Sequence, residues 1–442
     1  MLFSLPLGLW ILACQDKEQT MDCELSVARH HAMAATVSLQ TEQPMQLRVD
    51  IRQGDEEWSI TEPESVEVHN IPLLGLLPYE AVGYRLSGDG FECKGQLEAK
   101  ALSGNVPSIS VEVLDADRLA PESYWLGAAI SIDEGATPFV IDRQGQFRWV
   151  RPGEPSRIGG QIEFLEGTRA VIFNSFATDF SFDSGVLRTV SFEGESIRQQ
   201  PVPSSHHVFV QLPDGSVAYP AVDIREWLDP DTQELVPVIG DSIVELSPEG
   251  EQRTVFSAWD WKPVQKHDHW MSSFYGDAHD WTHANALQYI EARDSYLITF
   301  PHLDTFLEID RGTGAVVHEI SPEGDVVVDG DFDHPHDTHW SEDGLLRLIS
   351  HEADATVARA FSIEDDQLKL EWAYGEDLGI TGTVIGQHRR MSNGNILVNF
   401  GGAGLMHEVS PEGELLWSMS SELGYWLGNG QWFSDFYQGE FE

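Results

Sequence analysis

SNGNILVNFGGAGLMHEVSPEGELLWSM, residues 392–419, contains both of the turn patterns that decide the fold. Asn393-Gly394 stands before a short apolar run, and Glu412-Gly413 stands between two such runs. Glycine after an amide or acidic residue supplies the positive φ that tight hairpin turns require. The stretch therefore predicts consecutive antiparallel strands joined by hairpins.

The same two patterns alternate along most of the chain. The first, an acidic or amide residue beside glycine ahead of an apolar run, occurs at 212–220, 341–349 and 392–400. The second, a hairpin signature, occurs at 140–150, 245–256, 308–320 and 408–419. A repeat of about 40 to 50 residues is typical of four-stranded propeller blades. The spacing predicts an all-β fold, with a six-bladed β-propeller over residues 123–435.

A different pattern covers residues 24–115. Short runs alternate apolar and polar residues, with turn signals between them, which predicts a small antiparallel β-sandwich of the fibronectin type III or immunoglobulin-like kind. The segment from Val68 to Tyr79, followed by YRLS, resembles a strand, turn and strand of fibronectin type III domains. Proline and charge around 115–122 mark the expected boundary with the propeller.

The N-terminus resembles a bacterial lipoprotein signal. An apolar segment from Leu2 to Ala13 is followed by Cys14, in a lipobox-like sequence ILAC. We expect residues 1–23 to be a signal and tether, Cys14 to be lipidated, and the chain to lie in the cell envelope outside the cytoplasm, at the periplasmic face or the cell surface. The alternative is a buried N-terminal strand. If Cys14 is lipidated, Cys23 and Cys93 remain, and we expect them to form a disulfide; otherwise they are two separate buried thiols.

The charge balance limits the partners. The chain has 26 basic and 73 acidic residues, which gives a net charge of −47. Such a surface repels nucleic acid and anionic membranes, so we expect no nucleic-acid partner and membrane contact only through the N-terminal lipid. An anionic substrate would need local cationic groups to bind.

Histidine-rich segments occur at or just before the start of predicted inner strands. They are residues 205–209, 280–285, 333–339 and 387–390. Imidazole changes charge near neutral pH and can act as nucleophile, base or metal ligand. Blades start their inner strands around one end of a central channel, so these histidines can converge there. Another histidine pair, in residues 266–270, lies in a long insertion that we expect to form a lid or the channel rim.

Three stretches resemble the arylsulfotransferase family. They are DWTHANALQYIEARDSYLITFPHLDTFLEIDRGTG at 280–314, HDTHWSEDGLL at 336–346 and RRMSNGNILVNFGGAGLMHEVSPEGELLW at 389–417. The resemblance covers roughly residues 200–435 and implies a β-sandwich followed by a six-bladed propeller. It also implies a PAPS-independent enzyme that needs no cofactor and moves a sulfuryl group from a phenolic sulfate ester to a phenol.

The resemblance assigns roles to individual residues. It implies that His336 is the nucleophile and carries the sulfuryl group as a transient sulfohistidine, with His207, His283 and Asn285 around it. Neutral imidazole is a good nucleophile near pH 7, and its second nitrogen can be oriented by a partner such as Asp337. Nearby histidines and an amide can bind sulfuryl oxygens and transfer the phenolic proton.

The chain also departs from the family pattern. Pro301 replaces the arginine expected before His302 and Leu303, His339 replaces the arginine of the His-Asp-Ala-Arg element, and Val208 stands where aspartate is common. We therefore predict that substrate-binding residues include Arg390, His302 and His339, with Arg389 as a further candidate. A different substrate or an inactive site stays open.

Two other functions stay open on the sequence alone. His334, His336 and His339 with Asp333 could bind zinc in a metal-dependent hydrolase, but their spacing matches no strong zinc motif, so no metal site is predicted. A non-catalytic surface propeller that binds a ligand or partner is the other alternative, and it requires no role for His336.

Overall fold

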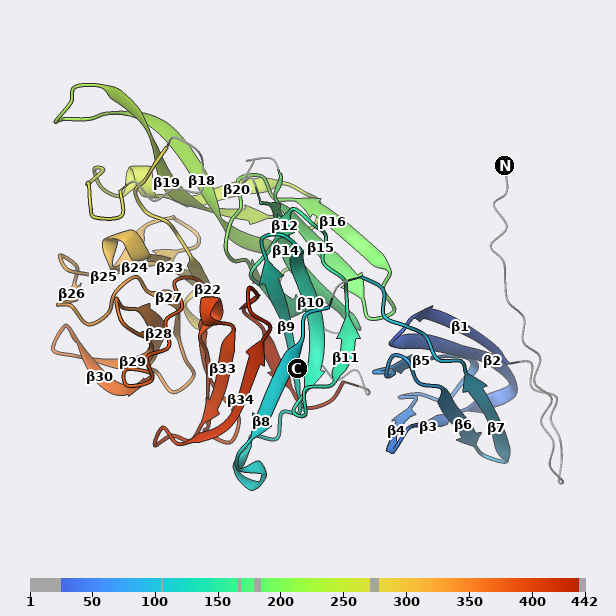
Figure 1. Cartoon of the computed structure of the whole chain (residues 1–442). Helices are drawn as coiled ribbons and strands as arrows, with labels where there is room; N and C mark the ends of the chain where they lie inside the picture. The colour runs from blue at the N-terminus through green and yellow to red at the C-terminus, as the bar shows by residue number, and fades with distance from the viewer. Residues whose placement is uncertain (1–24, 105, 166–167, 179–183, 271–277, 437–442) are drawn as a thin grey trace.

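The computed structural model describes residues 25–104, 106–165, 168–178, 184–270 and 278–436. Strands dominate these residues, as the sequence predicts, and the fold is all-β with curled sheets (Figure 1). The predicted signal segment, with Cys14 and Cys23, lies outside the described residues. Within them, no helix has the length and apolar character needed to cross a bilayer.

The first seven strands form two sheets. One has the order β1-β2-β5, with β1 (Ser26–His31), β2 (Ala34–Met45) and β5 (Val66–Leu74). The other has the order β4-β3-β6-β7, with β3 (Arg48–Gln53), β4 (Glu56–Thr61), β6 (Val82–Gly88) and β7 (Phe91–Leu97). Both sheets contribute to one buried apolar cluster, which includes Val37, Ile71, Val49 and Leu86. Cys93 is buried in this cluster, on β7.

Three further sheets follow in chain order. One joins β9 (Tyr124–Ser131), β10 (Gly135–Asp142) and β11 (Phe147–Val150) to the C-terminal strands β35 (Trp426–Leu427) and β36 (Gln431–Phe433). The next contains β12 (Arg157–Ile158), β13 (Ile162–Phe164), β14 (Ala170–Ala177), β15 (Val186–Ser191) and β16 (Ser196–Pro201). The third contains β17 (Val210–Gln211), β18 (Val217–Leu228), β19 (Leu235–Leu246), β20 (Gln252–Ser257) and β21 (His279–Asp280).

The remaining strands form two sheets. A nine-stranded sheet consists of β22 (Ala286–Ile290), β23 (Ser295–Phe300), β24 (Thr305–Asp310), β25 (Val316–Ser321), β26 (Val326–Val327), β27 (His336–Trp340), β28 (Leu346–His351), β29 (Thr356–Glu364) and β30 (Gln367–Tyr374). The last contains β31 (Gln387–Arg390), β32 (Ile396–Asn399), β33 (Leu405–Val409), β34 (Leu415–Ser421) and β8 (Ile109–Val113).

Short 3-10 turns connect some of the strands. They are η1 (Ala116–Arg118), η3 (Ala258–Asp260), η4 (Glu291–Arg293), η5 (Pro301–Leu303) and η6 (Gly401–Ala403).

The hairpin turns lie where the sequence places them. Gly344 donates its N–H to the Ser341 carbonyl between β27 and β28, and Gly394 donates to Met391 between β31 and β32, each over 2.9 Å. Both glycines have positive φ, of 80° and 93°, which a residue with a Cβ adopts only at a cost. The second turn type is confirmed by the Gly413 N–H, which donates to the Ser410 carbonyl over 2.8 Å between β33 and β34.

Buried apolar clusters join the sheets in a closed circuit. The pairs that share a cluster are Val140 with Val171, Leu187 with Tyr219, Ile243 with Ile298, Phe306 with Phe361, Ile349 with Val398, and Trp417 with Trp125. The last of these pairs packs the C-terminal sheet against the sheet that contains β9. The C-terminal strands β35 and β36 also pair with β9, so both ends of this region meet in one sheet.

Strand β8 differs from its expected place. Residues 109–113 fall inside the range predicted for the sandwich, yet β8 pairs antiparallel with β34, with Val113 opposite Trp417. An alternating run has the same appearance in either kind of sheet, so the sequence pattern could not assign this strand. The change from the first two sheets to the rest falls before Ile109.

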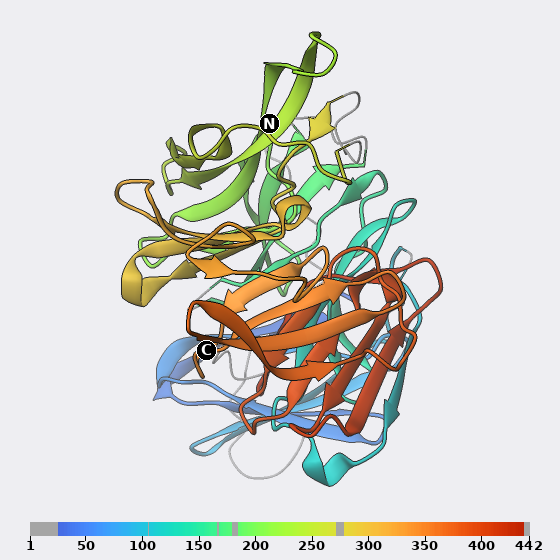
Figure 2. The same cartoon turned by 90° about the vertical axis from the view of Figure 1, so that its left-hand side faces the viewer.

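The first seven strands lie at one side of the other sheets, as Figure 1 shows in blue. Polar contacts join the parts: His31 Nε2 lies 2.8 Å from the Phe192 carbonyl oxygen, and Arg148 donates to Glu56 over 2.6 Å. Among the sheets that follow the first seven strands, the long β18–β19 hairpin projects beyond its neighbours in both views (Figures 1 and 2).

Candidate functional site

Histidines from several sheets meet at one end of the edge strands β17, β22 and β27. His207 precedes β17, His283 precedes β22, and His336 begins β27. His302 follows the end of β23, and His351 ends β28. Because β23 and β28 run antiparallel to β22 and β27, these strand ends lie beside the starts of the inner strands.

The rings form a continuous series. The centroid of His283 is 4.9 Å from that of His207 and 4.5 Å from that of His302, on which it stacks. The His334 ring lies 5.5 Å from His302 and 5.4 Å from His336. His336 contacts His351 at 4.8 Å. We call these residues the histidine cluster: His207, His283, His302, His334, His336 and His351.

The backbone at the cluster is strained. His207, His283 and His334 have φ values of 55°, 54° and 42°, in the left-handed region that residues with a Cβ avoid. Asp337 has φ 55°, and the β27–β28 register shifts between His336 and His339. Each such residue costs about 1–3 kcal/mol and persists only where its surroundings hold it, which is common at functional sites.

Asp241, on β19, organises one side of the cluster. It is fully buried and accepts hydrogen bonds from the Thr282 hydroxyl and the Ala284 N–H, each over 2.6 Å. Burial acts to raise the pKa of Asp241, but contact with His206 and the hydrogen bonds from Ala284 and Thr282 together outweigh burial and hold that pKa below its ordinary value. Asp241 is therefore an ionised carboxylate that holds the Thr282 side chain and the Ala284 backbone, on either side of His283.

A hydrogen-bonded chain runs from Asp241 to His207. His206 Nε2 lies 3.0 Å from Asp241, and His206 Nδ1 lies 2.7 Å from His207 Nδ1. Because the carboxylate accepts, His206 carries its proton on Nε2, and its Nδ1 accepts from the Nδ1–H of His207. This tautomer places the lone pair of His207 on Nε2, as a general base requires.

His336 is a buried, neutral imidazole. It is 4% exposed, and its Nε2 is buried with no hydrogen-bond partner among the described residues. Burial and the neighbouring histidines, His351 first, lower the pKa of His336 well below its ordinary value. A buried nitrogen without a hydrogen-bond partner is unusual in proteins. It occurs most often where a ligand or reacting group completes the site.

Asp337 does not orient His336, contrary to the expectation from sequence. Its carboxylate pairs with Arg389, whose Nη2 donates to Oδ1 over 2.7 Å, and it accepts the His388 N–H over 3.0 Å. The left-handed backbone of Asp337 turns its side chain away from the preceding residue, toward β31.

Asn285 and His283 hold the other side of the cluster. The Asn285 amide donates to the Pro335 carbonyl over 3.0 Å, which fixes the residue before His336. His283 Nδ1 donates to Asp280 Oδ2 over 2.7 Å. Burial lowers the pKa of His283, but the charge of Asp280 and this hydrogen bond outweigh burial and raise it above its ordinary value. The four residues to which the resemblance gives catalytic roles thus lie together.

The predicted substrate-binding residues separate. His302 lies in the cluster on η5, the turn that Pro301 begins. His339 lies away from it, with its Nδ1 3.0 Å from the Arg389 guanidinium. Arg390 is exposed and lies 3.8 Å from Asp343, in the turn at the opposite end of β27 from His336. Arg390 and His339 therefore do not contact the histidine cluster.

A polar cavity lies next to the cluster, among the inner strands. Its volume is about 370 Å³, and each sheet that surrounds it contributes lining residues. They include Glu163, Gln211, Gln288, His339, Gln387 and Gln431. Asp337 and Arg389 also line it, as an ion pair in which Asp337 is buried and Arg389 is partly exposed. Burial raises the pKa of Glu163 and, although Arg389 opposes it, that of Asp337.

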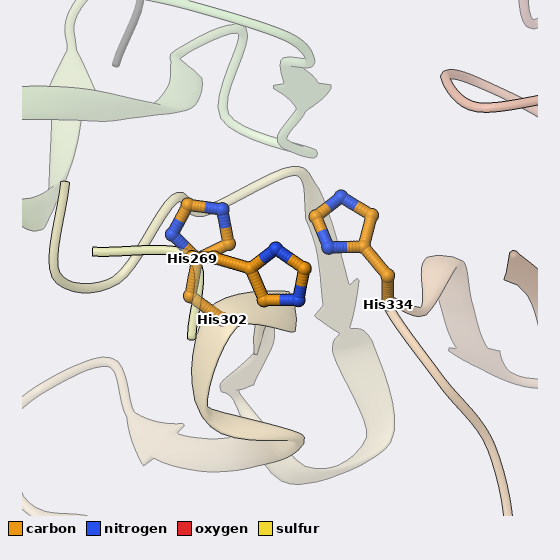
Figure 3. A group of neighbouring side chains, drawn as sticks. All are labelled: His269, His302 and His334. Atoms are coloured by element: carbon orange, nitrogen blue, oxygen red, sulfur yellow. The ribbon is translucent and has the colours of Figure 1, made fainter. Parts of the chain in front are cut away.

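The possible metal ligands differ from those that the sequence suggests. Among the described residues, His269, His302 and His334 form one group with ligand atoms within 4.8 Å of one another, and Asp280, His283 and His302 form another (Figure 3). Neither His336 nor His339 belongs to such a group. The suggested combination of His334, His336 and His339 fails because His339 lies beside Arg389, away from His334 and His336.

Sequence reasoning missed several members of the site. His206 and Asp280 lie in the same motifs, residues 205–209 and 280–285, as the residues that were predicted. These motifs could therefore have indicated them. Asp241 is a carboxylate within the apolar run VIGDSIVEL, a pattern that marks a buried charge. His351 lies in no motif, and His269 is in the insertion that was expected at the rim; tertiary structure alone places them in contact with the cluster.

Comparisons with known proteins identify a family. The sequence model of the family Arylsulfotransferase (ASST) matches residues 110–329. No curated protein matches the chain. The matched range contains His207, His283, Asn285 and His302, and it ends before His334 and His336.

Solved structures that match the chain share little sequence with it. A protein of unknown function from Bacteroides caccae is 12% identical, with a TM-score of 0.43, and the match covers 68% of this chain and 94% of that one. A streptogramin B lyase is 12% identical, with a TM-score of 0.38 and coverage of 70% and 86%. A virginiamycin B lyase from Staphylococcus aureus is 9% identical, with a TM-score of 0.38 and coverage of 70% and 87%. On the family match, the chain belongs to the arylsulfotransferase family.

Proposed function

We propose that the chain is a PAPS-independent aryl sulfotransferase that moves a sulfuryl group between phenols through a sulfohistidine on His336. The observation that carries the proposal is the convergence of His207, His283, Asn285 and His336 at one end of three inner strands. Family membership supports sulfuryl transfer from aryl sulfates. The unpartnered nitrogen of His336 supports its choice as the nucleophile.

In the first half-reaction, the lone pair of an imidazole nitrogen of His336 attacks sulfur. A nitrogen–sulfur bond forms while the sulfur–oxygen bond to the aryl group breaks, and the electron pair leaves with the phenolate oxygen. The product is an N-sulfo imidazolium that keeps the proton of the other ring nitrogen. The phenolate takes a proton from solvent.

In the second half-reaction, His207 acts as the base. Its Nε2 takes the proton of the acceptor phenol, whose oxygen attacks sulfur, and the pair of the nitrogen–sulfur bond returns to His336. Asp241 stabilises the proton on His207 through His206, because the three groups form one hydrogen-bonded chain. The proton then passes to solvent, which restores the starting state.

We further propose that residues 123–435, with β8, form a six-bladed β-propeller. The nine-stranded sheet then counts as two blades, β22–β25 and β27–β30, connected through the two-residue strand β26. The circuit of apolar clusters supports this arrangement. The first seven strands would be the separate β-sandwich of residues 24–115 without β8, because their two sheets share one core.

We also propose that the protein is lipid-anchored at Cys14 in the cell envelope outside the cytoplasm, with residues 1–23 as signal and tether. Cys23 and Cys93 would pair in that oxidising compartment. The lipobox-like sequence and the even number of remaining cysteines support both statements.

An assay of the full chain with p-nitrophenyl sulfate and phenol tests the function. We expect nitrophenol release and formation of phenyl sulfate. The His336→Asn variant should lose at least about a thousandfold in rate, since removal of a nucleophile abolishes the covalent route. His318→Asn changes an exposed histidine of β25 that pairs with Asp325, and it should keep the full rate.

Two results would contradict the proposal. One is an unchanged rate in His336→Asn. The other is no nitrophenol release by the folded wild-type chain, which would favour a non-catalytic, ligand-binding surface propeller.

A further inference from the structure

We propose that His269, His302 and His334 form a binding site for a divalent transition-metal ion of the zinc class. The centroid of the His302 ring lies 5.2 Å from that of His269 and 5.5 Å from that of His334, and His269 and His334 are 5.3 Å apart. One ring nitrogen from each residue lies within 4.8 Å of the others. Figure 3 shows the three rings close together.

His302 is oriented as metal-bound histidines are. Its Nδ1 lies 3.2 Å from the Asp280 carbonyl oxygen and donates a proton to it. This leaves Nε2 with the lone pair that a metal ion needs. In metal-bound histidines, the ring nitrogen that does not bind the metal usually donates a hydrogen bond to a carbonyl or carboxylate oxygen. His302 is 6% exposed, so this orientation is held by its surroundings.

His334 has an unsatisfied nitrogen at the site. Its Nδ1 is buried and has no hydrogen-bond partner among the described residues. Buried polar atoms are nearly always paired, so this one calls for a group that the protein itself does not supply. The left-handed backbone of His334 keeps the ring at this position, on the loop before β27.

His269 is exposed, but the loop that carries it is held on both sides of the residue. Its own N–H donates to His267 Nδ1 over 3.1 Å, and His267 Nε2 donates to the Trp281 carbonyl over 3.1 Å. The next residue, Trp270, stacks on His279 at 4.9 Å. The third imidazole is thus presented to the other two by a braced loop, and it contributes little to the core.

The ligand set selects the class of ion. Imidazole nitrogen suits zinc, copper, nickel and cobalt, whereas calcium and magnesium require oxygen ligands. Three histidines leave a coordination position open, as in catalytic zinc sites. The net charge of −47 also draws divalent cations to the protein.

The site is next to the proposed nucleophile. His334 contacts His336 at 5.4 Å, and His302 stacks on His283 at 4.5 Å. If the proposed function holds, on which this role alone rests, His269, His302 and His334 would hold the ion beside the proposed nucleophile, where it would stabilise charge on a sulfuryl or phenolate oxygen. Metal binding itself does not depend on that function.

Cobalt binding to the full, chelator-treated chain tests the site. We use excess Mg²⁺ to occupy the acidic surface, add Co²⁺, and follow the visible absorption of nitrogen-coordinated cobalt, with competition by Zn²⁺. We expect one ion per chain. His269→Ala should weaken cobalt binding at least about tenfold. Loss of a residue that only hydrogen-bonds to a ligand already weakens metal binding by about this factor, and loss of a ligand should weaken it more. His318→Ala is the matched control and should bind cobalt as the wild type does.

His269→Ala should keep the wild-type circular dichroism and melting temperature without metal, since His269 is exposed. His334→Ala provides a second variant with the same expected loss of binding. Absence of a saturable cobalt spectrum, or the same affinity in both variants as in the wild type, would overturn the proposal. Sulfuryl transfer by a metal-free chain would remove the catalytic role of the ion while leaving the proposed function intact. Metal binding without any transfer would remove the proposed function, and with it the catalytic role, while leaving the metal site intact.

Discussion

Arg389 and Arg390 are neighbours on β31, but their guanidinium groups lie in different surroundings. Arg389 pairs with the buried carboxylate of Asp337 and lines the polar cavity. Arg390 is exposed near Asp343, and the sequence had made it a candidate for binding the sulfate. The alternation of strand residues explains the difference, because successive side chains point to opposite sides.

The position of Arg390 yields the first prediction. Arg390→Gln should change the KM for p-nitrophenyl sulfate by less than about twofold, because an exposed ion pair at the far end of β27 contributes little. Steady-state kinetics on the full chain provide the measurement. A tenfold increase in KM would return Arg390 to the substrate site.

The chain from Asp241 to His207 yields the second prediction. His206→Phe removes the hydrogen bonds on both sides of the ring and should lower kcat about a hundredfold, with KM little changed, since general-base catalysis contributes at this level. His206→Gln is the matched variant. Its amide can donate to Asp241 and accept from His207, so it should recover part of the rate.

Equal activities of the two variants would contradict the hydrogen-bonded chain. Melting temperatures of both variants, measured alongside, separate this effect from a loss of folding, because a merely structural role would lower stability without the difference in kcat.

At the scale of elements, the contact between β34 and β9 closes the circuit of sheets. Trp417 on β34 is fully buried in the cluster that contains Trp125, and its indole N–H donates to the Arg143 carbonyl over 3.0 Å. The buried ion pair of Arg143 with Glu408 on β33 lies at the same contact. These groups join strands that are far apart in the sequence.

The closure yields the third prediction. Trp417→Ala should lower the free energy of unfolding by about 3–5 kcal/mol, as for other buried large side chains. Leu423→Ala is the control, just after the end of β34. Leu423 is fully exposed, and its substitution should change the free energy of unfolding by no more than about 0.5 kcal/mol. Urea unfolding measures both. A cost below about 1 kcal/mol for Trp417→Ala would mean that this contact does not stabilise the fold.

Individual elements show what the sequence could predict. The turns at Gly344, Gly394 and Gly413 were predictable because their backbone conformation depends on the local residues. The place of β8 was not, because its alternating pattern fits either a sandwich or a blade and only long-range pairing with β34 decides.

The candidate site divides in the same way. The positions of His207, His283 and His336 follow from motifs at strand starts, whereas those of His269 and His351 depend on which loops and strand ends come together. The direction of Asp337 depends on a bulge, which the residue types do not specify.

At the scale of the whole molecule, buried neutral histidines make stability depend on pH. Burial lowers the pKa of His407 from 6.5 to about 4, and that of His388 to about 3. The unfolded chain therefore binds protons below pH 6.5 that the folded chain does not bind. Each group reduces the stability of the fold as the pH falls from 6.5 toward its folded pKa.

His407 yields the fourth prediction. It lies on β33 beside Tyr374, whose hydroxyl is 2.9 Å from its Nδ1. The wild type should be more stable than His407→Gln at pH 7.5, and this difference should shrink by roughly 1–3 kcal/mol at pH 4.5. Urea unfolding at a series of pH values measures the difference in the free energy of unfolding between the two proteins. Because both contain the same carboxylates, their effect cancels in this difference. A constant difference would show that His407 takes up its proton equally in both states.

The central claim is that His336 carries the sulfuryl group, and trapping the intermediate tests it most directly. The full chain is mixed with p-nitrophenyl sulfate without acceptor, quenched, digested and mapped by mass spectrometry. We predict one added sulfuryl group on His336, which disappears when phenol is added before the quench. Label on another residue, such as His283, or nitrophenol release in step with turnover while His336 stays unlabelled, would contradict the account.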